Sequence, residues 1–438
     1  RLLRVDAQLV GSGEFPAGSR GLEVCLDDPD TAARQIAAGL SDVDAVLGID
    51  DQSVLAAAAT AARLGLPHNP VAAVAATREK IALRRLLAAG NVTQPEFRSA
   101  PPGAVAPAAA ELGFPVVVKP TGLSASRGVI RADTPGEASV AENRIRSILE
   151  TAGLPATAGL LVEQYIPGKE IVVEGLLGKE GLEVLAIIDK PDPLEGPFFE
   201  ETLFVSPSRH PEALQNAAIH LVEEAIDALG LITGPIHAEV RIDAGKCYLI
   251  EIAARSIGGL CGRALSFGLL GESLEVLILR SALDLGSPDS SPARPATGVL
   301  MLPIPATGSL TGVAGIDEAL RVPGIEDVTI TIAAGRRVEM LPEGDRYLGF
   351  VFAGGADPAS VEHSLRMAGN ELAITIDGEE VRPPTSLGTR RPVRGVLHQA
   401  QRLGPCRYRT EGIGEILSAL VCQSHLPLWY ADSEWPSE

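Results

Sequence analysis

A predicted β-hairpin carries two glutamates that could share a divalent cation. Residues 236–253 alternate apolar and polar side chains on both sides of a short Gly-containing turn, which is typical of two paired strands. If Asp243 pairs with Cys247 across a three-residue turn, Glu239 lies opposite Glu251, with Cβ atoms about 4.5–5.5 Å apart. Such a pair of like charges is unfavourable unless a cation neutralises it, and Mg²⁺ prefers carboxylate and phosphate oxygens. The alternative is a pair of exposed glutamates, each balanced by a nearby arginine.

A loop of small residues lies between a lysine and a further predicted strand. Lys119 ends the β-branched run FPVVVK, and the segment PTGLSASRG follows it directly. Backbone N–H groups of such a loop can bind phosphate oxygens, and the lysine adds a compact positive charge. The segment fits neither the dinucleotide-binding pattern G-x-G-x-x-G nor the phosphate-loop pattern G-x-x-x-x-G-K-[ST]. Its position between strands predicts a flap over a nucleotide, whereas the simplest alternative is an ordinary turn.

A third candidate is the carboxylate of Glu170, which follows the turn Pro167-Gly168 and opens a predicted strand. The apolar residues Ile171 and Val173 predict that this strand is buried, so Glu170 lies at its mouth. There it could accept hydrogen bonds from ribose hydroxyls. Alternatively, it is an edge charge that disfavours aggregation.

These residues must be positioned by strands and helices, which the patterns predict in several domains. Residues 1–76 alternate strands, at 21–26 and 43–49, with helices at 30–40 and 53–64, as in a parallel sheet. Further helices are expected at 77–90, 135–152, 211–229, 272–283 and 358–370, and further strands at 114–119, 128–131, 160–165, 171–177 and 183–189. The predicted domains are therefore 1–76, 77–286 and, after a Ser- and Pro-rich linker at 286–295, a strand-rich domain at 296–385; the tail 391–438 stays unassigned.

Composition argues against several functions. The 438 residues include 37 Lys and Arg against 56 Asp and Glu, a net charge of −19 that argues against nucleic-acid binding and anionic membranes. The longest uncharged stretch, 295–316, contains three prolines and four glycines, so no membrane span is expected. Five scattered cysteines predict a reduced, cytoplasmic setting, with Cys247 and Cys261 as packing residues. The first residue is Arg1, which leaves open whether the natural start is included.

Taken in order, these motifs resemble the ATP-grasp superfamily of carboxylate–amine ligases. The match covers about 77–260: the helix with Lys80, then FPVVVKP, TGLSASRGV, LVEQYIPGKE, GPIHAEVRI and YLIEIAARSIGG. Each motif is degenerate alone, but their order and spacing are specific. The part after the linker resembles the C-terminal domain of the L-amino-acid ligase branch, to which carnosine-synthase-like enzymes are close. The resemblance implies an α/β and α+β multidomain protein: an ATP-grasp fold with an N-terminal pre-ATP-grasp α/β domain and a strand-rich C-terminal domain.

The resemblance also implies roles for the matching residues around a nucleotide. Lys80 and Lys119 would hold the ATP phosphates, and Ser124, Ser126 and Gly128 would belong to the flap above them. The hinge that binds adenine, largely through backbone groups, would be formed by Glu163, Gln164, Tyr165 and Ile166, and the ribose would be bound by Glu170.

The remaining implied roles concern the chemistry. Glu239 and Glu251 match the metal ligands, and Arg255 matches the arginine that stabilises the acyl phosphate. Glu201 or its neighbour Glu200 lies where related ligases bind the amino-acid substrate and would hold an ammonium group, unless both are ordinary loop charges.

One position departs from the family. Many members have Asn two residues after the second metal glutamate, and this chain has Ala253 there. The departure leaves open whether Glu251 bridges two metals alone, whether one metal site is weaker, or whether the site is inactive.

The implied activity is ATP-dependent joining of a carboxylate to an amine through an acyl phosphate. The cofactors would be ATP and Mg²⁺, or Mn²⁺, the substrates would be amino acids, and relatives suggest a homodimer. The alternatives are a biotin-carboxylase-like or purine-pathway ATP-grasp enzyme and a non-catalytic ATP-binding relative. No lysine of the chain neighbours a methionine, so a built-in biotinyl segment is not visible.

Overall fold

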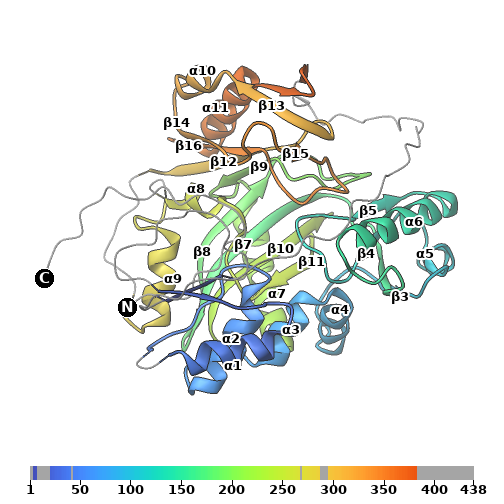
Figure 1. The fold of residues 1–438 in the computed structure, drawn as a ribbon, viewed down its shortest axis with the longest axis vertical. Coiled ribbons are helices and arrows are strands. Elements are labelled where there is room, and N and C mark those ends of the chain that lie inside the picture. Colours follow the sequence, from blue (N-terminus) through green and yellow to red (C-terminus); the bar gives the residue numbers. More distant parts are fainter. Residues whose placement is uncertain (1–2, 7–19, 41–42, 267–268, 287–293, 382–438) are drawn as a thin grey trace, which may run out of the picture.

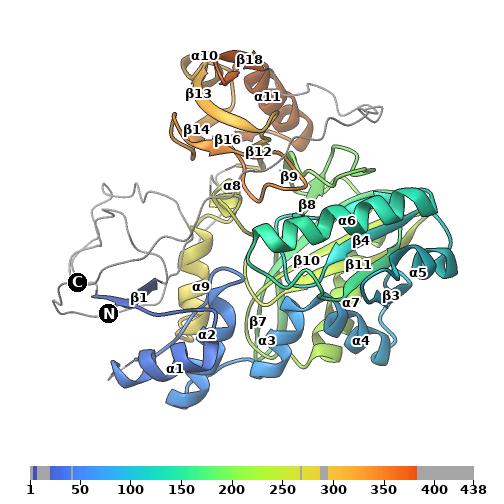
Figure 2. The same ribbon diagram turned by 45° about the vertical axis from the view of Figure 1, so that its right-hand side comes forward.

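The computed structural model describes residues 3–6, 20–40, 43–266, 269–286 and 294–381. These residues form four sheets, of which the largest has eight strands and runs through the centre of the molecule (Figures 1 and 2). In Figure 1 the blue N-terminal helices lie below this sheet, a small sheet lies to its right and the orange C-terminal elements lie above it. The tail at 391–438 and most of the predicted linker lie outside the described residues.

The N-terminal part is a helical layer beside a short parallel strand pair. Its elements are β1 (Leu3–Asp6), β2 (Arg20–Glu23), α1 (Pro29–Ala38), α2 (Ser53–Leu64) and α3 (Val71–Arg78). The strand predicted at 43–49 is wrong, because no strand in the described part of the chain pairs with this segment. Its apolar residues Val46 and Leu47 instead pack against two buried clusters.

The helix predicted at 77–90 is divided, and the division positions Lys80. Glu79 is extended, with φ −113° and ψ 105°, and separates α3 from α4 (Lys80–Ala89). Its carboxylate accepts hydrogen bonds from the backbone N–H groups of Ile81 and Ala82, as an N-cap does. Lys80 therefore opens a helix instead of lying within one.

The small sheet forms a layer of its own with two helices. Its order is β3 (Phe97–Ala100), β6 (Leu160–Gln164), β4 (Val116–Pro120) and β5 (Ile130–Ala132), all antiparallel. One apolar cluster joins it to α5 (Val105–Leu112) and α6 (Pro135–Thr151). The predicted flap is the connection between β4 and β5, so it projects from this layer.

The central sheet carries helices on both faces. Its antiparallel order is β11 (Lys246–Ala253), β10 (Gly234–Asp243), β7 (Lys169–Gly178), β8 (Gly181–Lys190), β9 (Leu203–Ser206), β12 (Ala296–Leu302), β16 (Gly349–Gly355) and β14 (Ile325–Ile330). One face packs on α7 (Glu212–Leu229), while α8 (Gly262–Ser266) and α9 (Leu274–Ala282) pack on the other. Strand β7 is buried on both faces, as its apolar run predicts.

The C-terminal elements are continuous with the central sheet. Strand β12 follows the predicted linker and pairs with both β9 and β16, so the sheet crosses the predicted domain boundary. The remaining elements are β13 (Gly308–Ala314), α10 (Ile316–Leu320), β15 (Arg337–Val338), α11 (Pro358–Glu371), β17 (Ala373–Ile376) and β18 (Glu379–Val381). None of the helices in the described ranges has the length and apolarity that a bilayer span requires.

A β-bulge sets the register of the predicted hairpin. The turn has two residues, Ala244 and Gly245, with φ values of 48° and 82°, so Asp243 pairs with Lys246 and the predicted three-residue turn is wrong. The register shifts again between Glu239 and Val240, and this bulge restores the pairing of Glu239 with Glu251. The predicted pairing of these two glutamates is therefore confirmed, although the turn is one residue shorter than predicted.

Gly168 allows the turn before β7 to lie against β10. Its φ is +92°, and a Cβ atom at this position would lie 2.1 Å from the carbonyl oxygen of Ile242. The obstacle is backbone, which cannot rotate away as a side chain can. This contact sets the spacing between the turn and the central sheet.

We expect Gly168→Ala to destabilise the protein strongly. A matched control is Gly153→Ala, which also places a side chain at positive φ, +73°, but meets no atom within 4 Å. The control should cost about 1–2 kcal/mol, and Gly168→Ala should cost at least about 2 kcal/mol more because of the clash. Urea unfolding of both variants measures the difference, and equal losses would contradict the steric argument.

Candidate functional site

Alternate residues of β7 and β10 form a polar stripe on one face of the central sheet. Glu170 lies opposite Arg241 and Glu174 lies opposite His237, with Glu239 between the two pairs. Arg241 Nε donates to Glu170 Oε2 at 2.8 Å, and His237 Nδ1 lies 2.9 Å from Glu174 Oε2. His237, Glu239 and Arg241 therefore share one face of β10, as the alternation of its sequence predicts.

His237 is a cation in this setting. Burial alone would lower its pKa, but hydrogen bonds to Glu174 and Glu239 outweigh burial and raise the pKa to about 9. The other oxygen of Glu174 accepts a 2.8 Å hydrogen bond from the backbone N–H of Ile257. The imidazole is thus held by its partners and is not available as a base at neutral pH.

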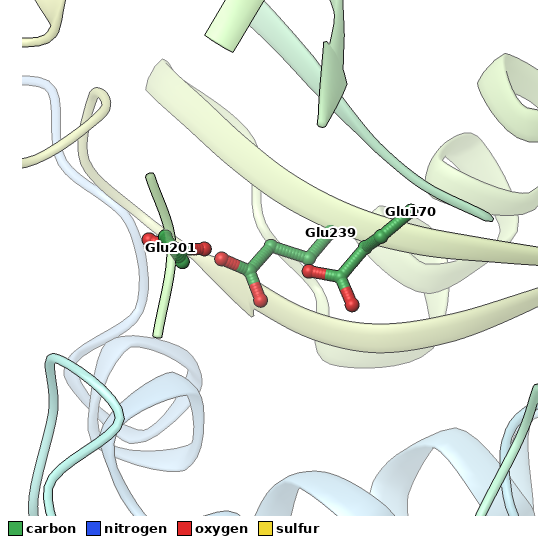
Figure 3. Close-up of side chains that lie close together, drawn as sticks. All are labelled: Glu170, Glu201 and Glu239. Carbon is green, nitrogen blue, oxygen red and sulfur yellow. The ribbon is translucent and has the colours of Figure 1, made fainter. Parts of the chain in front are cut away.

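Lys190 lies among three carboxylates at the end of the stripe. Its Nζ is 2.6 Å from Glu170 Oε1 and 3.1 Å from Glu239 Oε1, and it also pairs with Glu201. Figure 3 shows the three acids pointing toward one another, and one oxygen of each lies within 4.8 Å of the others. The lysine comes from β8, Glu170 from β7, Glu239 from β10 and Glu201 from the loop before β9. Sequence reasoning missed Lys190, which no motif singles out.

The charges of this cluster depend on one another. Burial would lower the pKa of Lys190, but the surrounding carboxylates outweigh it and hold the pKa well above its usual value. Burial raises the pKa of Glu201, and the negative charge of Glu239 raises it further. The positive charge of Lys190 lowers the pKa but offsets only part of these effects, so the pKa of Glu201 is raised to about 7. The cluster therefore keeps an ammonium group fixed at its centre.

Lys80 connects the second predicted metal ligand to the flap. Its Nζ donates to the carbonyl oxygen of Leu123 at 2.7 Å and lies 3.8 Å from Glu251 Oε1. Its backbone N–H donates to the carbonyl oxygen of Thr121 at 3.1 Å. The start of α4 is thereby attached to the first residues of the flap.

Glu163 is a buried carboxylate that holds Lys119. Its Oε2 lies 2.6 Å from Lys119 Nζ and its Oε1 lies 2.5 Å from Arg84 Nε, with both acid and arginine side chains only 2% exposed. Burial would raise its pKa, but the charges of Arg84 and Lys119 outweigh burial and lower the pKa to about 2. The side chain of this predicted hinge residue thus faces Lys119, the lysine predicted to bind phosphate.

Arg84 joins the two sheets and was missed by sequence reasoning. Besides Glu163, it donates to the backbone carbonyls of Leu249 at 3.1 Å and Ile250 at 2.6 Å in β11. Three of its N–H-bearing nitrogens are therefore used inside the protein. The signal was present in the helix pattern, because Arg84 lies three residues from both Ile81 and Leu87 on the buried face of α4.

Several backbone groups of the predicted hinge already form hydrogen bonds within the protein. The N–H groups of Gln164 and Tyr165 donate to the carbonyls of Glu96 and Pro115 at 2.8 and 3.1 Å. The carbonyl of Ile166 accepts a 2.7 Å hydrogen bond from Arg241 Nη1. A ligand in this region must use other groups of the segment.

The flap is held by the C-terminal part of the chain. Ala125 and Ser126 have positive φ values of 55° and 54°, a conformation unfavourable for residues with a Cβ atom. The backbone N–H of Gly128 donates to the carbonyl of Pro342 at 2.9 Å, and Arg127 Nε donates to the carbonyl of Glu343 at 2.9 Å. The turn at 342–345 therefore stabilises a strained flap.

Glu343 also binds the helix behind the flap. Its two oxygens accept hydrogen bonds from Arg144 of α6 at 2.6 and 2.9 Å, in the two-pronged geometry that suits a guanidinium and a carboxylate. Ser124 and the other flap residues were predicted from the sequence, but this contact joins residues far apart in the chain.

Arg255 lies just beyond β11 and is paired with an acid of the N-terminal part of the chain. Its Nε and Nη2 donate to the two oxygens of Asp51, at 2.8 and 3.0 Å. Burial would lower the pKa of Arg255, but Asp51 and Glu251 hold it above its usual range. Asp51 precedes α2 in the N-terminal part and was not singled out from the sequence.

Cys247 and Cys261 are packing residues, as predicted. Cys247 and Cys261 are both buried within apolar clusters, and burial raises the pKa of each thiol. A raised pKa keeps sulfur protonated and unreactive.

The donor set of the site fits a hard divalent cation. Glu239 and Glu251 are register partners on adjacent strands, and carboxylate oxygens are the ligands that Mg²⁺ and Mn²⁺ prefer. Each carboxylate now lies beside a lysine ammonium, Lys190 for the first and Lys80 for the second. Both glutamates thus already have a cationic partner.

Comparison with known families supports the resemblance inferred from the motifs. Residues 112–264 match the ATP-grasp domain, and residues 300–377 match the L-amino acid ligase C-terminal domain 2. The chain therefore contains an ATP-grasp domain, and its residues 300–377 are similar to the C-terminal domain of L-amino acid ligases. Both the predicted family and the predicted fold class are confirmed.

The relatives include enzymes that join amino acids. The alanine–anticapsin ligase of Bacillus subtilis is 26% identical over 247 residues, which are 50% of this chain and 50% of that protein. A D-alanine–D-alanine ligase of Gloeobacter violaceus is 33% identical over 205 residues, which are 43% of this chain and 63% of that protein. The chain therefore covers less than two thirds of the length of each of these relatives.

Solved structures extend the likeness over most of the chain. An L-amino acid ligase from Bacillus licheniformis has a TM-score of 0.68 and 26% identity, covering 83% of this chain and 90% of that one. A biotin carboxylase from Campylobacter jejuni has a TM-score of 0.60 and 16% identity, covering 85% of this chain and 86% of that one. The second likeness shows the fold alone.

We expect Glu163→Gln to destabilise the protein by about 3 kcal/mol at neutral pH, because it leaves Arg84 and Lys119 buried without a counter-charge. The pKa of Glu163 is about 2, against an ordinary value of 4.5. Its contribution is therefore complete above pH 4.5 and is lost as the pH falls toward 2. Urea unfolding from pH 7 to pH 3 should show the difference between wild type and variant shrinking. The exposed Glu111→Gln is the control, and a pH-independent difference would contradict the argument.

We expect Glu343→Ala to expose the flap to trypsin, which cleaves after Arg127. The lost ion pair is partly exposed, so about 0.5–1 kcal/mol of closure is removed. Cleavage at Arg127 should become roughly two- to fivefold faster if the flap opens and closes quickly. Mass spectrometry identifies the cut, with Glu111→Ala as the control. An unchanged rate would show that the turn at 342–345 does not restrain the flap.

Proposed function

We propose that this chain is an ATP-dependent ligase that joins the carboxylate of an amino acid to an amine through an acyl phosphate. The observation that carries the proposal is that Lys80 joins the flap to Glu251, which is the register partner of Glu239. The second lysine, Lys119, lies near the end of β4, the strand from which the flap projects. The match to an L-amino acid ligase C-terminal domain favours amide formation over bicarbonate chemistry.

In this proposal the two lysines bind the ATP phosphates. Lys80 and Lys119 are each held by an acid, Glu251 and Glu163, which keeps the ammonium groups in place before nucleotide arrives. The flap residues Ser124 and Ser126 would cover the phosphates with backbone N–H groups, consistent with the positive φ values around Ser126. Gly128, whose N–H already donates to the carbonyl of Pro342, would instead supply the turn of the flap at a positive φ of 71°.

The nucleoside would lie against the hinge and the stripe. The ring of Tyr165 is buried with the guanidinium of Arg131 over it at 4.2 Å, so this part of the hinge is held in place. Glu170 would bind the ribose hydroxyls. Its oxygens already accept hydrogen bonds from Lys190 and Arg241, but each carboxylate oxygen can accept a second.

A divalent cation at Glu239 and Glu251 would neutralise phosphate charge, and Mn²⁺ could replace Mg²⁺ there. Ala253 supplies no ligand, so the two glutamates carry the binding in this chain. The remaining chemistry is positioning and charge stabilisation, as in other phosphoryl transfers.

The reaction has two steps. A carboxylate oxygen of the acid attacks the γ-phosphorus, the bond to the bridging oxygen breaks and ADP leaves with the electron pair. The amine nitrogen then attacks the acyl carbon, phosphate leaves and the amine proton passes to solvent. Arg255, with N–H groups beyond those used by Asp51, would stabilise the transferring phosphoryl group and the oxyanion.

Glu201 is the proposed receptor for the ammonium group of the amino acid. It already binds an ammonium group, that of Lys190, and its side chain is 22% exposed while Lys190 is 3% exposed. The outer side of the carboxylate is therefore the side that a substrate can reach. A homodimer and a cytoplasmic location remain predictions.

The deciding experiment is Mg²⁺-dependent ADP release with single amino acids and with pairs, followed by mass spectrometry of the products. A product mass equal to two amino acids less one water would support the proposal and name both substrates. Release with bicarbonate alone would favour a carboxylase-like activity instead. Nucleotide binding without release under any condition would favour the non-catalytic alternative that Ala253 suggests.

We expect Glu251→Gln to reduce amino-acid-dependent ADP release at least about 100-fold, because loss of a metal ligand removes several kcal/mol of transition-state stabilisation. Circular dichroism should show that the variant stays folded. Glu212→Gln, an exposed acid at the start of α7, is the control and should retain full activity. Activity of Glu251→Gln equal to wild type would remove this residue from the metal site.

A further inference from the structure

The turn before α2 contains two acids, Asp50 and Asp51, of which the second binds Arg255. Asp50 is used locally, since its Oδ1 accepts hydrogen bonds from the backbone N–H groups of Gln52 and Ser53 at 3.0 and 2.8 Å. The next residue, Asp51, has a partner far away in the chain. Both of its oxygens bind Arg255, 204 positions later in the chain.

The hydrogen bonds of Arg255 leave part of its guanidinium available. A guanidinium has five N–H groups. Two donate to Asp51, through Nε and Nη2, and one donates from Nη1 to the carbonyl of Ser256 at 2.9 Å. One N–H remains on each terminal nitrogen, so an anion can bind Arg255 without displacing Asp51.

The pair is partly shielded and lies among other charges of the site. The side chains of Arg255 and Asp51 are 12% and 29% exposed. Burial would raise the pKa of Asp51, but the charges of Arg255, Lys80 and Arg78 outweigh burial and lower it. Asp51 is therefore ionised at neutral pH and holds the arginine through charge as well as through hydrogen bonds.

We infer that Asp51 is a positioning residue, which fixes the guanidinium of Arg255 so that its free N–H groups meet the transferring phosphoryl group. The N-terminal part of the chain thereby completes the site of the ATP-grasp domain. The inference rests on the proposed function of Arg255. Two other roles would give different results: a clamp between domains that does nothing for the reaction, and an inhibitory partner that must release the arginine.

The test uses the full chain and a probe that needs no knowledge of the substrates. Binding of Mg²⁺·ADP is measured by calorimetry with and without fluoroaluminate, which mimics a phosphoryl group in transfer. The variants are Asp51→Asn, Asp51→Glu, Arg255→Ala and the double variant Asp51→Asn/Arg255→Ala. Asp30→Asn is the matched control, because Asp30 pairs with Arg34 and Arg63 in the same N-terminal layer but away from Arg255.

We expect Asp51→Asn to weaken the fluoroaluminate complex at least tenfold while Mg²⁺·ADP alone binds within twofold of wild type. Asp51→Glu should restore part of the loss, and Asp30→Asn should change neither affinity. In the Arg255→Ala background, Asp51→Asn should have less than a twofold further effect, because residues that act as one unit are not additive.

Each contrary result has a distinct meaning. Equal weakening of both complexes, or full additivity with Arg255→Ala, would overturn positioning in favour of a structural clamp. A tighter fluoroaluminate complex in Asp51→Asn would overturn it in favour of inhibition. Wild-type protein that binds no nucleotide would sink the proposed function together with this inference, whereas nucleotide binding without ligation leaves the comparison of the two complexes valid.

Discussion

The whole site depends on one constraint: carboxylates gathered on one face of a sheet stay ionised only if cations are brought to them. Glu170, Glu174 and Glu239 lie on adjacent strands; the first two are buried and the third is 21% exposed, so isolated charge is costly there. Their partners are Arg241, His237 and Lys190, which come from two different strands. The packing of β7, β8 and β10 therefore also determines which charged side chains meet.

The same constraint joins the two sheets. Glu163 belongs to the small sheet, and its two cations are Lys119 from that sheet and Arg84 from α4. Arg84 then uses its remaining nitrogens on backbone carbonyls of β11 in the central sheet. One buried arginine thus connects the layer that carries the flap with the layer that carries the acids, so a displacement of one layer would leave buried charge unpaired.

The outer parts of the chain contribute through contacts of the same kind. The N-terminal part supplies Asp51 to Arg255, and the C-terminal part supplies the turn with Glu343 to the flap. Strand β12, which follows the predicted linker, lies inside the eight-stranded sheet. The parts that the sequence separates are therefore joined by contacts at the candidate site.

The sequence by itself determined the features that are local in the chain. The strand alternation of β10, the helix at 53–64 and the flap between two strands follow from patterns a few residues long, and the order of motifs identified the family. It also predicted the pairing of Glu239 with Glu251, but only because a bulge compensated for a turn one residue shorter than expected.

Only the tertiary structure decided which cation meets which acid. The partners of Glu163, Arg255 and Glu239 lie 79, 204 and 49 positions away. No local pattern encodes such pairings, because helix and strand propensities and hydrophobic periodicity describe only residues close together in the sequence. A buried charge instead pairs with whichever opposite charge lies near it in the folded molecule. For the same reason the segment at 43–49, although apolar and β-branched, is not a strand: in the described part of the chain the fold provides it no neighbour.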